Sequence, residues 1–179
     1  MSEYGINSVR TYTVPPVHLL DIAHEAGLKV MVGLPWEQHI TFLDDVDRKE
    51  NILKKVREGV AACKNHPAVL CYSIGNEIPA PIVRWYGKKK VEQFLHELYN
   101  TAKSADPEGL VTYVNYPTTE YLDLPFLDFY CFNVYLETRE KLKNYLLRLQ
   151  NLSGEKPLVL AEIGLDSRRN GLDKQAEVL

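Results

Sequence analysis

Residues 68–77 read Ala-Val-Leu-Cys-Tyr-Ser-Ile-Gly-Asn-Glu, an apolar run that ends abruptly in an amide and an acid. The apolar part predicts a buried strand, and the acid, Glu77, follows its C-terminal end. A second apolar run, residues 157–164, carries Glu162 near its own C-terminal end. Because active sites built on parallel strands lie at the C-terminal strand ends, we expect the two carboxylates to share one site.

Two carboxylates at one site are the working groups of most glycosidases. A single glutamate after a strand is often only a solvated loop residue or a neighbour of a helix N-cap. Two glutamates in the same register favour a catalytic pair instead. Asn76, directly before Glu77, adds an amide that can hydrogen-bond a sugar hydroxyl.

Strand-like and helix-like patterns alternate along the whole chain, which is typical of a parallel sheet with crossover helices in an α/β fold. The predicted strands cover residues 6–12, 29–34, 69–74, 110–115, 127–135 and 158–163. The predicted helices cover residues 16–26, 47–64, 89–105, 138–152 and 170–179. No linker or low-complexity segment interrupts this alternation, so we expect residues 1–179 to form a single domain.

The composition is that of an ordinary globular protein, with 45% hydrophobic and 25% charged residues among 179. The net charge of -3 and the interleaved basic residues argue against nucleic-acid binding. No apolar run is long enough for a membrane span, and the first residues lack the pattern of a secretory signal. Three widely spaced cysteines indicate reduced thiols rather than disulfides, which favours a cytoplasmic protein.

Metal and cofactor sites are not indicated by the sequence. The five histidines contain no His-Glu-x-x-His pattern, because His96-Glu97 is followed by Asn100 where the second histidine would stand. No glycine-rich nucleotide-binding loop follows any predicted strand. We therefore expect no metal and no cofactor.

Four short motifs resemble the catalytic (β/α)8 barrel of retaining glycoside hydrolases of clan A, most closely the family 2 type. Residues 5–12 are similar to the second barrel strand, and residues 73–77 to the end of the fourth. Residues 132–135 are similar to the sixth strand, and residues 160–164 to the seventh. Each motif alone is weak, but their combination along the chain is specific.

The resemblance implies a role for four residues. Glu162 would be the nucleophile of a double displacement and Glu77 the acid/base. Arg10 would lie near the nucleophile, and Tyr135 would contact it. The substrate would be a carbohydrate β-glycoside.

The resemblance also implies a partial barrel. About six parallel strands are predicted, whereas a closed barrel has eight, so strands one and eight have no counterpart. The β-sandwich domains that usually precede family 2 barrels are not found either. The outer strands should expose unpaired edges. We therefore expect a homo-oligomer whose interface is formed by these edges, or by the helix over 16–26 and the tail over 170–179.

Four further residues near predicted strand ends are candidates for substrate contacts. Trp36 and Trp85 could stack on the apolar face of a sugar ring, or could equally pack a loop onto the barrel. His39 and Asn115 could hydrogen-bond sugar hydroxyls. None of them specifies which sugar is bound.

Two other functions compete with a glycosidase. One is a catalytically impaired barrel fragment that only binds carbohydrate or remains as a structural remnant. The other is a different enzyme on a similar scaffold, such as an aldolase. The sequence has no suitably placed strand-end lysine for Schiff-base chemistry, which argues against the aldolase.

Overall fold

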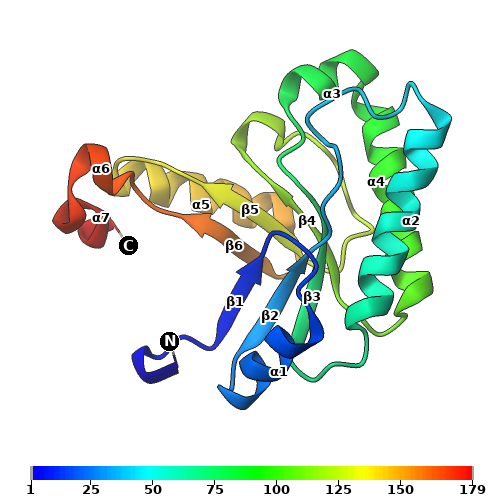
Figure 1. The fold of residues 1–179 in the computed structure, drawn as a ribbon. Coiled ribbons are helices and arrows are strands. Elements are labelled where there is room, and N and C mark those ends of the chain that lie inside the picture. Colours follow the sequence, from blue (N-terminus) through cyan, green and yellow to red (C-terminus); the bar gives the residue numbers. More distant parts are fainter. Residues whose placement is uncertain (1, 179) are drawn as a thin grey trace.

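The computed structural model describes residues 2–178, and its centre is a single six-stranded sheet. All neighbouring strands are parallel, and their order in the sheet follows the sequence. The strands are β1 (Ser8–Thr11), β2 (Lys29–Gly33), β3 (Val69–Asn76), β4 (Val111–Asn115), β5 (Tyr130–Val134) and β6 (Leu158–Ile163). The sheet curls into part of a barrel (Figure 1), which confirms the predicted α/β fold with six strands of a (β/α)8 barrel.

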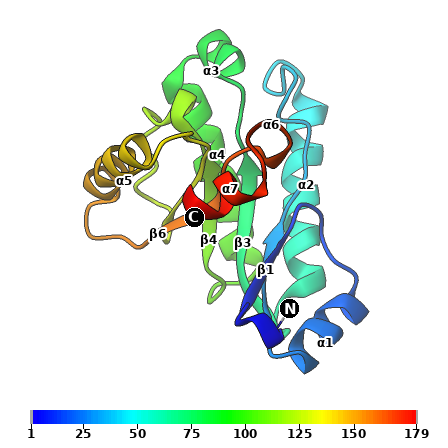
Figure 2. The same cartoon turned by 90° about the vertical axis from the view of Figure 1, so that its left-hand side faces the viewer.

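Helices follow most strands, and the four longest of those described cover the outer face of the sheet. They are α1 (Val17–Glu25), α2 (Val46–Cys63), α3 (Ala80–Tyr86), α4 (Lys88–Ala105), α5 (Arg139–Ser153), α6 (Ser167–Asn170) and α7 (Leu172–Val178), with short 3-10 helices at Ser2–Tyr4 and Pro117–Thr119. Helices α2 and α4 pack side by side, while α6 and α7 lie at the C-terminal end of the chain (Figure 2). No helix within the described range 2–178 combines the length and apolar character needed to cross a membrane.

Strand side chains alternate between two apolar layers because successive residues of a strand point to opposite faces. In β3, Tyr72 and Ile74 join the main core between sheet and helices, and both are fully buried. Cys71 points the other way, into an inner cluster with Met31 and Cys131. Burying a side chain the size of Ile74 contributes about 1.5–3 kcal/mol, so the core between sheet and helices stabilises the fold.

The structure differs from the predicted elements in four places. Helix α3 was not predicted; it begins after Pro79 and carries Pro81 in its first turn, where a proline is tolerated. Strands β1 and β5 are shorter than predicted. Helix α7 occupies most of the predicted range 170–179, and a separate short helix, α6, lies before it and is divided from it at Gly171 with φ 84°. Residue 179 lies outside the described residues.

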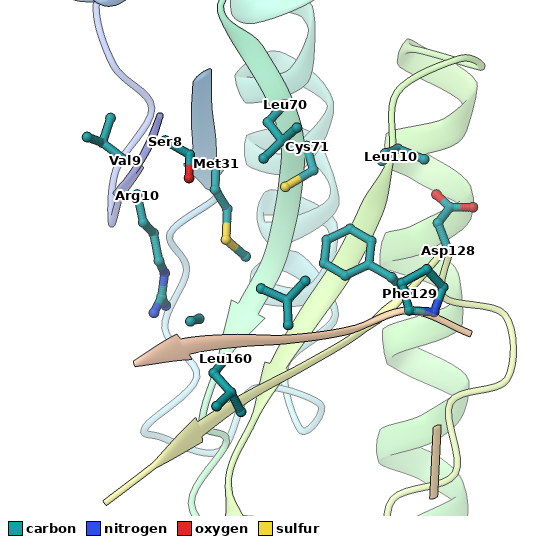
Figure 3. A pocket seen from close by; sticks show the side chains of 13 residues that line it. Ser8, Val9, Arg10, Met31, Leu70, Cys71, Leu110, Asp128, Phe129 and Leu160 are labelled. Carbon is teal, nitrogen blue, oxygen red and sulfur yellow. The ribbon is translucent and has the colours of Figure 1, made fainter. Parts of the chain in front are cut away.

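Strands β1 and β6 are the two edges of the sheet, since each pairs with one neighbour only. An apolar cavity of about 440 Å³ opens on the inner face between them, toward the N-terminal ends of the strands (Figure 3). Leu70, Leu110 and Val159 line it and remain 40–46% exposed. The inner face is therefore apolar and incompletely covered.

Candidate active site

Glu77 and Glu162 both lie at the C-terminal edge of the sheet, as their positions in the sequence indicate. Glu77 follows β3 directly, and its backbone N–H donates to the carbonyl of Val114 at 2.9 Å. Its φ of 50° is uncommon for a residue other than glycine and marks a local strain of the kind that collects at functional sites. Glu162 is the last but one residue of β6.

The side chain of Asn133 joins the two glutamates. Asn133 is buried near the end of β5, and its Nδ2 lies 2.8 Å from Oε1 of Glu77 and 2.9 Å from Oε1 of Glu162. Two oxygens that lie 2.8 Å and 2.9 Å from one nitrogen are at most 5.7 Å apart. The nitrogen carries two hydrogens, so it can donate to both carboxylates at once.

Four donors surround the carboxylate of Glu162. Oε1 accepts from Nη1 of Arg10 at 2.8 Å, from Nδ2 of Asn133 and from the hydroxyl of Tyr12. Oε2 accepts from the hydroxyl of Tyr135 at 2.6 Å. Half-burial pushes the pKa of Glu162 upward, but the hydrogen bonds from the two tyrosines and the charge of Arg10 outweigh it and hold this pKa below its usual range.

The pKa values of the two tyrosines shift upward, opposite to that of Glu162. The hydrogen bond to Glu162 is the largest cause that raises the pKa of Tyr135 to about 12, followed by burial. Burial, and then the hydrogen bond to Glu162, raise the pKa of Tyr12. Both hydroxyls therefore remain protonated donors, and Glu162 remains an ionised acceptor, at neutral pH.

Arg10, on the edge strand β1, links the C-terminal ends of β3 and β6. Its Nη1 contacts Glu162, while Nη2 donates to Oδ1 of Asn76 at 2.7 Å. Oδ1 of Asn76 also faces Nδ2 of Asn133 at 3.2 Å. The Arg10 side chain is 12% exposed and extends toward the arrowhead of β6 in Figure 3. Arg10, Asn76, Tyr135 and the two glutamates thus form one connected cluster.

The other four predicted contact residues lie outside this cluster. Trp36 is buried, its indole N–H donates to the carbonyl of Ile74 at 2.7 Å, and its ring packs edge-on against Phe42 and Phe94. This is the environment of a core residue rather than of an open stacking surface. Trp85, on α3, is 71% exposed.

Asn115 and His39 have different environments. The amide oxygen of Asn115 accepts from the hydroxyl of Thr119 at 2.7 Å and from the N–H of Tyr116 at 2.9 Å, so the amide closes a local turn after β4. His39 is exposed and lines a hollow of about 270 Å³. Asn76 and Gln38 border the same hollow, which places it beside the cluster.

Two residues of the cluster, Tyr12 and Asn133, were not among the predicted site residues. Each lies two positions from a predicted site residue: Tyr12 follows Arg10, and Asn133 precedes Tyr135. Residues two apart on a strand point to the same face, so the period of the strand was the signal that could have found them. Within residues 2–178, no group of three or more histidine, cysteine, aspartate or glutamate side chains is arranged to hold a metal ion.

A curled parallel sheet with two carboxylates at its C-terminal edge is typical of (β/α) barrel glycosidases. The family model of glycosyl hydrolases family 2, TIM barrel domain, matches residues 1–178. The chain belongs to this family.

Three solved structures show the same fold. A β-glucuronidase from Ruminococcus gnavus in complex with uronic deoxynojirimycin is 21% identical, with a TM-score of 0.74 over 89% of this chain and 29% of that one. The β-D-glucuronidase of Dictyoglomus thermophilum is 25% identical, with a TM-score of 0.71 over 88% of this chain and 30% of that one. A Bifidobacterium dentium β-glucuronidase complexed with coumarin-3-O-glucuronide is 21% identical, with a TM-score of 0.70 over 88% and 27%. The chain spans less than a third of the length of these relatives.

Proposed function

We propose that the chain carries the catalytic groups of a retaining β-glycoside hydrolase, with Glu162 as nucleophile and Glu77 as acid/base. The observation that carries this proposal is the bridge from Asn133, which keeps an oxygen of each carboxylate within 5.7 Å of the other. Retaining glycosidases hold their two carboxyl groups about 5–5.5 Å apart, whereas inverting ones need about 6.5–9.5 Å to fit a water.

The surroundings of the two acids support this division of roles. Glu162 is kept ionised by Arg10 and the tyrosines, as a nucleophile must be. Glu77 accepts one hydrogen bond, on Oε1 from Asn133. When Glu77 is protonated, the proton to be given away therefore sits on Oε2.

Two steps follow from this arrangement. In the first, Glu162 attacks the anomeric carbon while Glu77 protonates the departing oxygen, which leaves the sugar bound to Glu162 as an ester. In the second, Glu77 removes a proton from a water that attacks the same carbon, and Glu162 leaves as a carboxylate. Two inversions retain the β configuration.

The substrate is proposed to be a carbohydrate β-glycoside. The solved relatives are β-glucuronidases, so an aryl β-glucuronide belongs in the first set of substrates, with the β-galactoside, β-glucoside and β-mannoside beside it. The test is hydrolysis of this panel by the purified chain, by Glu162→Gln and by Glu77→Gln.

Glu108→Gln is the matched control, because Glu108 is an exposed glutamate outside the cluster. We expect activity in the wild type and the control, a large loss in the two other variants, and β-anomer as the first product by proton NMR. First release of the α-anomer, or equal activity in all four proteins, contradicts the proposal.

A further inference from the structure

Tyr12 contacts the candidate nucleophile from a different strand than Tyr135 does. It directly follows β1 and donates its hydroxyl hydrogen to Oε1 of Glu162. The guanidinium carbon of Arg10 lies 4.5 Å from the centre of the Tyr12 ring, a cation–π contact that orients the ring. Tyr12 is thus held by one partner of Glu162 while it binds Glu162 itself.

The donors are divided unequally between the two oxygens of Glu162. Oε1 accepts from Arg10, Tyr12 and Asn133, whereas Oε2 accepts from Tyr135. An oxygen that bonds to the anomeric carbon must give up hydrogen bonds on the side of attack. Attack through Oε2 requires the release of one donor, and attack through Oε1 would disturb three.

We propose that Tyr12 is a positioning residue that anchors Oε1 of Glu162, so that Glu162 both attacks and leaves through Oε2. This inference rests on the proposed function. In the first step, Oε2 bonds to the anomeric carbon while the bond from that carbon to the leaving oxygen breaks. The leaving oxygen takes the proton of Glu77. In the second step, water bonds to that carbon, its proton goes to Glu77, and the electron pair of the bond to Oε2 returns to the carboxylate. Tyr12 and Arg10 stabilise the charge as it returns.

Tyr12→Phe tests this role, because it removes the hydroxyl and keeps the ring over Arg10. A hydrogen bond to a charged group is among the stronger ones in proteins, so we expect kcat to fall by about tenfold to a hundredfold. Because Tyr12 stabilises the carboxylate that leaves in the second step, that step slows more than the first, so the sugar ester accumulates and KM falls together with kcat. A rapid burst of aryl alcohol, measured with the best aryl β-glycoside of the panel, should precede the slow phase.

A titration provides a readout that needs no turnover. The charged and titratable groups that face Glu162 are Arg10 and Tyr12 from the β1 side, Tyr135 after β5 and Glu77 after β3. Removing one donor to the ionised form raises the pKa of Glu162. NMR of protein labelled with carbon-13 at glutamate side chains should show this rise in Tyr12→Phe.

Tyr145→Phe is the matched control, because the Tyr145 hydroxyl also donates to a carboxylate, Oε2 of Glu120, at 2.7 Å and away from the cluster. It should leave kcat, KM and the Glu162 titration unchanged.

The outcomes separate the two proposals. If Tyr12→Phe leaves the Glu162 titration unchanged, or lowers kcat without lowering KM, the role of Tyr12 is overturned. If the wild type hydrolyses no substrate of the panel while the Glu162 titration still shifts in Tyr12→Phe, the proposed hydrolysis fails and the anchoring of Oε1 stands.

Discussion

The two glutamates of the cluster meet very different neighbours although one amide joins them. Glu162 accepts hydrogen bonds from four residues, one of them an arginine, whereas Glu77 accepts one from Asn133. Environments that differ in this way are what separates a nucleophile from an acid in carboxylate pairs. At the scale of single residues, the assigned roles can therefore be tested one side chain at a time.

The two glutamates should differ in their dependence on the leaving group. With an activated aryl leaving group, which departs with little protonation, we expect Glu162→Ala to lose more activity than Glu77→Ala. Added azide should partly restore turnover in Glu77→Ala, because it attacks the sugar ester without a general base. Steady-state rates with and without azide measure this. Equal losses that azide does not relieve in either variant contradict the assigned roles.

The pH profile should respond to Tyr135. Its hydrogen bond helps to hold the pKa of Glu162 low, and protonated Glu162 cannot attack. In Tyr135→Phe the pKa of Glu162 rises, so the acidic limb of kcat/KM should move to higher pH. The profile is measured with a substrate whose leaving group does not titrate in that range. A limb that stays in place or moves to lower pH shows that Tyr135 does not stabilise the ionised form.

At the scale of elements, β1 and β2 approach each other closely where the cluster is anchored. A Cβ added at Gly33, in β2, would lie 2.5 Å from the backbone oxygen of Thr11 in β1. Since backbone atoms cannot move aside cheaply, we expect Gly33→Ala to push β1 away, to cost about 1–3 kcal/mol of stability and to displace Arg10.

Gly59→Ala in α2 is the comparison, because the added atom would meet side-chain carbons of Leu34 and Val14, at 2.8 Å and 2.9 Å, rather than backbone atoms. Alanine also suits a helix better than glycine, which offsets part of the crowding. Chemical denaturation of both variants measures the difference. Equal stability of the two variants would mean that β1 tolerates the displacement.

The sequence predicted the elements that follow a strong pattern and missed those that depend on tertiary contacts. All six strands were found, because short apolar or β-branched runs alternate with helical patterns along the chain. Helix α3 was missed, since it is short and carries Pro81. Trp36 shows the limit for the site: an aromatic residue after a strand can face a substrate or the core, and only the packing against Phe42 and Phe94 decides.

At the scale of the whole molecule, the two edge strands leave backbone groups unpaired and an apolar inner face open. Edges and apolar surfaces of this kind favour association. We expect the isolated chain to self-associate through β1, β6 or the flanking helices. Light scattering after size exclusion, at micromolar concentration, measures the mass. A stable monomer over the concentration range contradicts this expectation.

The strand order has a consequence for how the chain folds. Each strand pairs with the one before it in the sequence, so the sheet can grow step by step as the chain lengthens. The contact between Arg10 and Glu162 is different, because it joins residues 152 positions apart. It forms only after the last strand has docked, so the cluster around Glu162 is completed late and reports on a finished fold rather than guiding the early steps.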